Sequence, residues 1–277
     1  MKIFRIGAAV AALLSISISA GAAGWNWPVN PLKEVYVDCD IGQSLQDAVD
    51  MAGWTARPYT IYVTGTCDED ITISRNRLQI NGGGEAQISG RIRNFGASIT
   101  LRDLTITGPG EGLRASGGRT RVLDVHFVNN DADGIHATGN AMVSLRGGSV
   151  DGSSGSGIDL QSSVLNLHNV QIMSNMGNGI HALMSQITIT GETQIFSNDV
   201  HGIDANLHSS LLIDGPVVVT ANDGSGIRVE LDSGLLAFGP VEINGNGEID
   251  AICGDSESSA VFTDSQPATI LCSDFDW

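Results

Sequence analysis

The sequence predicts an all-β protein, a right-handed parallel β-helix in which each coil of the solenoid takes about 22–24 residues. A glycine followed by an aliphatic residue recurs at intervals of 22, 23, 22, 23 and 24 residues. The segments between these pairs are too short for helices and alternate apolar with polar residues, as strands do. Connections between parallel strands are right-handed, so the stacked coils should form a right-handed solenoid. The pairs begin at Gly112, Gly134, Gly157, Gly179, Gly202 and Gly226, and Glu248 begins a seventh copy that lacks the glycine.

Each repeat is expected to contain three short strands. The repeat that begins at Gly179 contains G-I-H-A, then Q-I-T-I-T, then T-Q-I-F-S. The residue after each glycine should point into the solenoid, and the residue two positions later should form a second interior column. The first column is Ile135, Ile158, Ile180, Ile203, Ile227 and Ile249, and the second is Ala137, Leu160, Ala182, Ala205, Val229 and Ala251. A polar column precedes the glycines at Asn130, Ser153, Asn175, Asn198, Asn222 and Asn246.

The ends of the chain differ from its middle. Lys2 and Arg5 precede a short apolar run and a small-residue cleavage signal that ends at Ala22, so export to the periplasm or out of the cell is expected. No stretch is long enough to span a membrane. Ser44 to Ala52 is predicted to form an amphipathic helix, capped by Ser44, over the open edge of the first coil. The expected division is a signal peptide over 1–22, an extension with the capping helix over 23–58, the β-helix over 59–252 and a C-terminal cap over 253–277.

Four cysteines in an exported chain indicate disulfides. Of the three possible connectivities, Cys39–Cys67 with Cys253–Cys272 is the most economical, because it joins cysteines that are close in the sequence. A zinc site is the alternative, and it is disfavoured because no pair has C-x-x-C spacing.

The residue after each interior aliphatic should point outward, so one outer face should carry an aligned column of polar side chains. This column is Arg114, His136, Asp159, His181, Asp204, Arg228 and Asp250. Adjacent strands are roughly 4.8 Å apart, so Asp159 and Asp204 would flank His181 about 9.6 Å apart at the backbone, which is at the upper limit for two carboxylates that act with a water between them. Asp204 would also have a cation on each side.

Two interpretations of the column remain open at this point. In one it is a substrate groove, in which Asp159, His181 and Asp204 are catalytic and the other members bind substrate. A loop acid such as Asp133, Asp199 or Asp223 could replace one carboxylate. In the other it is a solvated ladder that avoids stacking like charges. No metal site is expected, because histidines on alternate strands start too far apart to share an ion.

Charge narrows the possible partners. The chain has a formal net charge of −17, and residues 123–277 hold 2 Arg against 20 acidic residues. Nucleic acid is therefore not an expected partner, and a polyanion would be repelled by this half unless Ca²⁺ intervened. No calcium-binding motif is present and no cofactor is expected.

The tryptophans and tyrosines all lie outside the regular coils, so no stacking platform for sugars is expected in the groove.

The repeated G-I spacing, the capping helix and the asparagine column together resemble the right-handed parallel β-helix (pectin-lyase-like) superfamily over about residues 35–275. The resemblance implies a polysaccharide ligand and an active groove on the outer face of the sheet formed by the G-I-x-A strands. The segment N-N-D-A-D-G-I-H, from Asn129 to His136, is similar to the N-T-D-G motif of polygalacturonases, but that family's other motifs are absent. Two functions are consistent with these features. In the first, the chain binds an extended polysaccharide and cleaves or modifies it as a hydrolase or lyase-like enzyme. In the second, it is a non-catalytic structural or surface-interaction scaffold.

Overall fold

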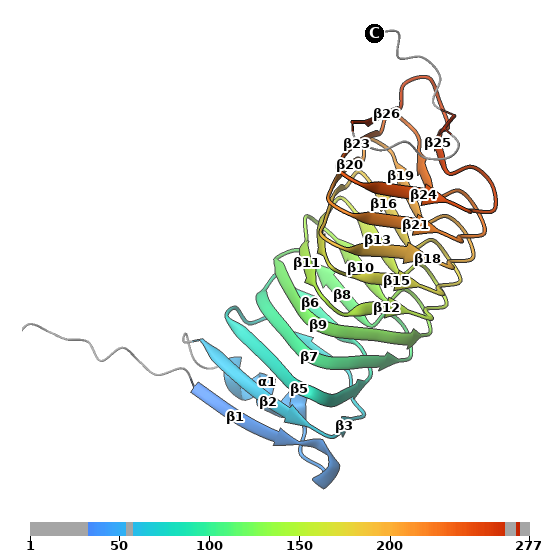
Figure 1. Cartoon of the computed structure of the whole chain (residues 1–277). Helices are drawn as coiled ribbons and strands as arrows, with labels where there is room; N and C mark the ends of the chain where they lie inside the picture. Colours follow the sequence, from blue (N-terminus) through green and yellow to red (C-terminus); the bar gives the residue numbers. More distant parts are fainter. Residues whose placement is uncertain (1–32, 54–57, 264–269, 272–277) are drawn as a thin grey trace, which may run out of the picture. The chain divides into compact units, whose positions relative to one another are not determined.

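The computed structural model describes residues 33–53, 58–263 and 270–271. The strands of these residues form two sheets, of 17 and 10 strands, that wind together into a solenoid (Figure 1). Neighbouring strands pair in parallel, for example β10 (Ile135–Thr138) with β13 (Ile158–Gln161) and β17 (Gln186–Thr190) with β20 (Ser210–Asp214). The predicted fold class, an all-β parallel β-helix, is confirmed.

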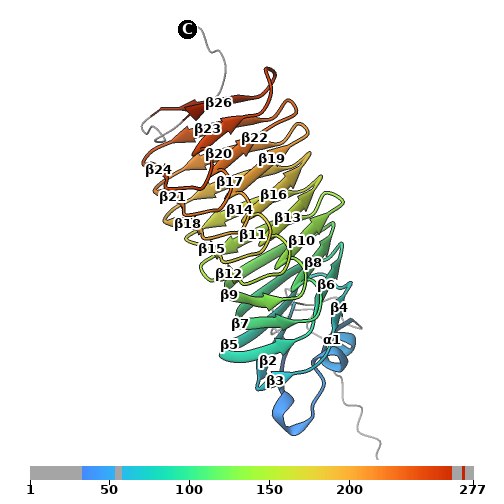
Figure 2. The same ribbon diagram turned by 90° about the vertical axis from the view of Figure 1, so that its right-hand side faces the viewer.

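Figure 2 shows strands of the ten-stranded sheet stacked side by side along the solenoid. The strands of this sheet are β4 (Ile71–Ile73), β6 (Ile92–Phe95), β8 (Leu113–Ser116), β10 (Ile135–Thr138), β13 (Ile158–Gln161), β16 (Ile180–Leu183), β19 (Ile203–Asn206), β22 (Ile227–Val229), β25 (Ala251–Cys253) and β27 (Ile270–Leu271).

The other two strands of each coil belong to the seventeen-stranded sheet. Its strands are β1 (Lys33–Asp38), β2 (Tyr59–Thr64), β3 (Thr66–Cys67), β5 (Leu78–Ser89), β7 (Ser98–Gly108), β9 (Arg119–Asn130), β11 (Met142–Arg146), β12 (Ser149–Asp151), β14 (Val164–His168), β15 (Gln171–Met173), β17 (Gln186–Thr190), β18 (Thr193–Phe196), β20 (Ser210–Asp214), β21 (Val217–Thr220), β23 (Gly234–Phe238), β24 (Val241–Asn244) and β26 (Ser259–Phe262). In the early coils, each of the long strands β5, β7 and β9 takes the place of two short strands. In later coils the same part of the repeat forms two separate strands, such as β11 and β12.

The interior is a stack of aliphatic columns, as the repeat predicts. Ile135, Ile158, Ile180, Ile203 and Ile227 are all fully buried and follow one another in register. Each burial of such a side chain stabilises the fold by about 1.5–3 kcal/mol. The prediction is wrong for the last member: Ile249 is only half-buried, and Ala251 lies opposite Ile227 in its place.

The asparagine column explains this shift. A ladder of hydrogen bonds joins Asn175, Asn198, Asn222 and Asn246. The side-chain nitrogen of each asparagine donates to the side-chain oxygen of the next one. Asn222 and Asn246 are 24 residues apart, so keeping the ladder intact makes this coil 24 residues long. The glycine position of that coil is then taken by Asp250, not by Glu248.

The N-terminal edge is closed by the predicted helix. Helix α1 (Leu45–Gly53) buries Leu45 and Val49 against the first coil, after a short 3-10 helix over Cys39–Ile41. Ser44 accepts a hydrogen bond from the Asp47 amide at 3.1 Å, as a cap should. Glu69 adds a second cap, since its carboxylate accepts from the Leu45 and Gln46 amides at 2.6 and 3.3 Å.

The Cys39–Cys67 disulfide is present and ties this edge to β3. Cys253 is also disulfide-bonded, whereas its expected partner Cys272 lies outside the described residues. The expected signal peptide over 1–22 lies outside them too. Strands β26 and β27 extend both sheets into the segment expected as a C-terminal cap. No helix in the described ranges is long and apolar enough to cross a membrane.

Candidate functional site

The outer face of the ten-stranded sheet carries the predicted column of polar side chains. The strand register places His136 beside Asp159 and Asp159 beside His181. Arg114 precedes this group in register, and Asp204 and Arg228 follow it. The column also continues upstream to Arg93, which lies opposite Arg114. Sequence reasoning missed Arg93, because the repeat is less regular before residue 112.

Asp250 does not belong to this column, and its predicted place there is wrong. Ile252 lies opposite Arg228, two positions further along the chain. Asp250 is 6% exposed and accepts a hydrogen bond from the Asn246 side chain at 3.2 Å. The physical reason is the 24-residue coil set by the asparagine ladder, which moves Asp250 to the corner where earlier coils have glycine.

Two imidazoles converge on one carboxylate. His181 Nδ1 hydrogen-bonds to Asp159 Oδ1 at 2.6 Å. His136 Nδ1 lies 2.9 Å from Asp159 Oδ2 and 3.5 Å from Asp133 Oδ2. We call these four residues the His–Asp cluster. Asp133 comes from the turn before β10 and is one of the three loop acids singled out from the sequence.

The cluster is charged at neutral pH. The carboxylates of Asp133 and Asp159 raise the pKa of His136 to about 9, and Asp159 also raises the pKa of His181. Burial alone would raise the pKa of Asp159, but the bonds from the two imidazoles more than offset it, and the pKa lies well below its usual range. Asp159 is therefore an anion at neutral pH, and His136 is a cation.

This arrangement leaves the second nitrogen of each ring available. Both histidines direct Nδ1 toward Asp159, and no residue in the described part of the chain hydrogen-bonds to Nε2 of either ring. A carboxylate on Nδ1 holds an imidazole in one orientation and stabilises its protonated form, so that Nε2 can exchange a proton with a ligand. The rings are 15% and 26% exposed, so a ligand on this face can reach them.

Asp204 has a different environment from the one expected. Its Oδ1 accepts a hydrogen bond from Asn206 at 2.9 Å, and no ion pair to it occurs within the described ranges. Arg228 instead bonds to Glu230 and approaches His201 Nε2 at 3.2 Å. The carboxylate with a cation on each side is thus Asp159, not Asp204. Arg114 likewise pairs with Glu111, at 3.2 Å.

Three groups of the cluster could also bind a divalent cation. One ligand atom each from Asp133, His136 and Asp159 lie within 4.8 Å of one another. Histidine and carboxylate are ligands that zinc accepts. Cys39, Cys67 and Glu69 lie equally close together, but those sulfurs are joined in a disulfide and are not thiolates. His201 is not a metal ligand here, because Arg228 faces its Nε2 and the Ser225 amide donates to its Nδ1.

Comparison with known proteins identifies the fold family. Residues 59–218 match the family described as "Right handed beta helix region". The chain belongs to the right-handed β-helix family. A comparison of this β-helix protein with curated proteins gives no match.

Three solved β-helix structures are similar to this one. Pectate lyase Pel9A is 12% identical, with a TM-score of 0.57, over 86% of this chain and 79% of that one. The A-module of mannuronan C-5 epimerase AlgE4 from Azotobacter vinelandii is 15% identical, with a TM-score of 0.52, over 78% and 75%. The enzymatically active domain of tailspike protein 2 of bacteriophage CBA120 is 14% identical, with a TM-score of 0.51, over 88% and 46%. These similarities establish a shared fold.

Proposed function

We propose that this β-helix protein binds an extended polysaccharide along the outer face of the ten-stranded sheet and cleaves or modifies it by acid–base chemistry at the His–Asp cluster. The observation that carries the proposal is the pair of partly exposed imidazoles that both approach the Asp159 carboxylate through Nδ1, so that Nε2 is not used in these contacts. Two of the structurally similar proteins are named for action on pectate and on mannuronan, which supports a polysaccharide as the ligand.

The cluster assigns different roles to its members. His136 is protonated at neutral pH and suits the role of proton donor, or of a cation that neutralises a substrate carboxylate. His181 is the second proton-carrying group. Asp159 is a positioning residue, since both its oxygens are engaged by the imidazoles. Asp204 lies next to His181 in register and is 7% exposed, so its negative charge acts on His181 from the neighbouring strand.

We further propose that the protein works outside the cytoplasm. The expected signal peptide over residues 1–22 supports this location. The Cys39–Cys67 disulfide also supports it, because such bonds persist in oxidising compartments.

The test is product analysis with purified protein on pectate, mannuronan and neutral polysaccharides. His136→Gln and His181→Gln remove a proton-carrying group, so turnover should fall by roughly 10²–10⁴-fold. Asp159→Asn should lower kcat more than it raises KM and should shift the pH profile. His208→Gln is the matched control, because His208 also pairs with an aspartate, Asp232 at 3.0 Å, but is 70% exposed and lies in a turn.

A non-catalytic scaffold is the competing function. The observation that favours it is that cluster members satisfy one another's charge without a ligand. Absence of turnover on every polymer, with binding unchanged in His136→Gln, would support the scaffold and overturn the proposed chemistry.

A further inference from the structure

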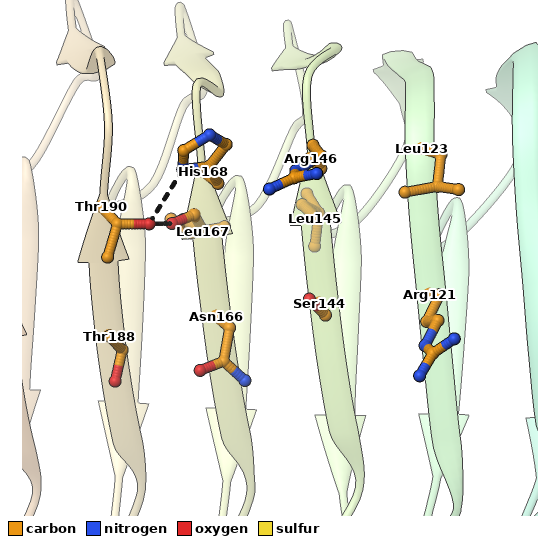
Figure 3. A pocket seen from close by; sticks show the side chains of 10 residues that line it. All are labelled: Arg121, Leu123, Ser144, Leu145, Arg146, Asn166, Leu167, His168, Thr188 and Thr190. Carbon is orange, nitrogen blue, oxygen red and sulfur yellow. Dashed lines mark hydrogen bonds between the residues drawn. The ribbon is translucent and has the colours of Figure 1, made fainter.

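A hollow lies on a different face of the solenoid from the His–Asp cluster, on the seventeen-stranded sheet. It has a volume of about 360 Å³ and crosses β9, β11, β14 and β17. Figure 3 shows the side chains that project from these four strands. The polar residues that line it are Arg121, Ser144, Arg146, Asn166, His168, Thr188 and Thr190. We call this surface the arginine groove.

The arginine groove has a positive charge on a strongly acidic chain. No acidic side chain lines it. Arg121 and Arg146 have no carboxylate partner among the described residues, whereas Arg91, Arg102 and Arg228 do. Arg146 is one of only two cationic residues, excluding histidines, between residue 123 and the C-terminus. Two uncompensated guanidinium groups in one hollow form a site for an anion, because arginine's planar set of donors matches a carboxylate.

His168 is held in one tautomer by its neighbour. The Thr190 hydroxyl donates to the Leu167 carbonyl at 3.0 Å, so its oxygen must accept from His168 Nδ1, at 3.1 Å (Figure 3). Nε2 is therefore free to accept a hydrogen bond from a hydroxyl when the ring is neutral, or to donate to an anion when it is protonated.

Neutral hydrogen-bonding groups are arranged beside the charges. Ser144, Asn166 and Thr188 lie in one register row with Arg121. They provide hydroxyl and amide groups at intervals of roughly 4.8 Å, the spacing of strands. A ligand that fits this surface carries hydroxyl groups beside its negative charges.

The groove is elongated and has a defined end. A second hollow of about 330 Å³ shares Arg121 and continues across Arg77, Gln79 and Thr100. In the other direction, the position after Thr190 in the register is Asp214, whose carboxylate would repel an anion. The surface is thus extended along the solenoid axis, as an oligomeric ligand requires.

We propose that the arginine groove binds an acidic oligosaccharide, whose carboxylates contact Arg121 and Arg146 and whose hydroxyls contact the Ser144–Asn166–Thr188 row. Charge complementarity and the neutral row favour this ligand over single-stranded DNA, which has few hydroxyls and binds through base stacking on aromatic side chains. No Phe, Tyr or Trp side chain lines the hollow that crosses β9, β11, β14 and β17. This inference goes beyond the proposed function, since it requires no chemistry at the His–Asp cluster.

The experiment is calorimetric titration of the full chain with oligogalacturonate, a neutral galactose oligomer and single-stranded DNA. Arg121→Gln and Arg146→Gln should each weaken oligogalacturonate binding about tenfold, the loss expected for one charge-assisted contact. Arg119→Gln is the matched control: it removes the same charge from an exposed position on the same strand but does not line the groove. Its affinity should stay close to that of the wild type.

The same titration in His136→Gln separates the two proposals. Binding that survives in His136→Gln and is lost in Arg121→Gln belongs to the arginine groove, whatever the outcome at the other face. The inference is overturned if the galactose oligomer or DNA binds as tightly as oligogalacturonate. It is also overturned if Arg119→Gln loses as much affinity as Arg121→Gln, because bulk charge alone would then explain the binding.

Discussion

Asp159 and Asp204 occupy equivalent positions on strands two coils apart, yet their surroundings differ. Asp159 accepts a hydrogen bond from His181 and forms an ion pair with His136, one from each neighbouring strand, whereas Asp204 accepts a hydrogen bond from Asn206 on its own strand. Arg228, the neighbour of Asp204 in the strand register, bonds to Glu230 instead. A partly buried carboxylate that loses its cationic partners remains desolvated without compensation, so Asp159 should be the more sensitive of the two to changes in its partners.

The cluster predicts a pH-dependent contribution to stability. The folded pKa of His136 lies above its ordinary value, so this contribution is complete below about pH 6.5 and is lost as the pH rises through about 9. The folded pKa of Asp159 is lowered, so the contribution is also lost in acid, below about pH 4. Asp159→Asn should therefore cost roughly 2 kcal/mol between those limits and less above pH 9 or so.

Urea denaturation of the wild type and the variant across this pH range measures the effect. Asp204→Asn is the control and should show a flatter dependence, because Asn206 does not titrate. An Asp159→Asn deficit that stays constant from mildly acidic to strongly basic pH would contradict the charged pairing.

At the scale of elements, the asparagine ladder sets the length of each coil, and it has one interruption. Ser153 occupies a ladder position, and its amide donates to Asn175 at 3.0 Å like the others. The Ser153 side chain is too short to bond to Asn130 in the preceding coil or to Asn175 in the following coil. As a result the side-chain atoms of buried Asn130 and the Ser153 hydroxyl find no partner within the described part of the chain. Unsatisfied buried polar groups of this kind destabilise a fold.

Ser153→Asn should therefore stabilise the protein by about 1 kcal/mol, because the added amide can bond to both Asn130 and Asn175. Thermal unfolding followed by circular dichroism measures the change. Ser154→Asn is the matched control, since Ser154 is exposed in the same turn and should have little effect. A lower melting temperature for Ser153→Asn would show that the corner has no room for the larger side chain.

At the scale of the whole β-helix, each coil contacts mainly the coils before and after it, so stability depends on nearest-neighbour interfaces and on the ends. The N-terminal end is closed by α1, by Glu69 and by the Cys39–Cys67 disulfide, which spans a sequence separation of 28 residues. These contacts restrict the opening of the first coils.

Replacing both Cys39 and Cys67 by serine should lower the free energy of unfolding by about 3 kcal/mol through the lost loop constraint. Hydrogen exchange should then increase first in β1 to β5, while β16 to β21 keep their protection. These central strands are the internal control. Equal loss of protection in all coils would show that the solenoid unfolds as one unit and that the end does not limit it.

The amino-acid sequence alone determined the coil length, the interior columns, the Ser44-capped helix and the Cys39–Cys67 pair. These features depend on short-range periodicity and on neighbours within a single repeat, which a linear pattern contains. Only the tertiary structure decided that His181 pairs with Asp159 and not with Asp204, because both aspartates neighbour it in the strand register and side-chain conformation selects one. The tertiary structure also decided the place of Asp250. The segment E-I-D-A resembles the earlier copies, but the hydrogen bonds of Asn246 to Asn222 and Asp250 fix a coil that is two residues longer than this resemblance implies. The arginine groove had no signal in the repeat, because Arg121 comes from a long strand of an irregular coil and meets Arg146 only when the coils stack.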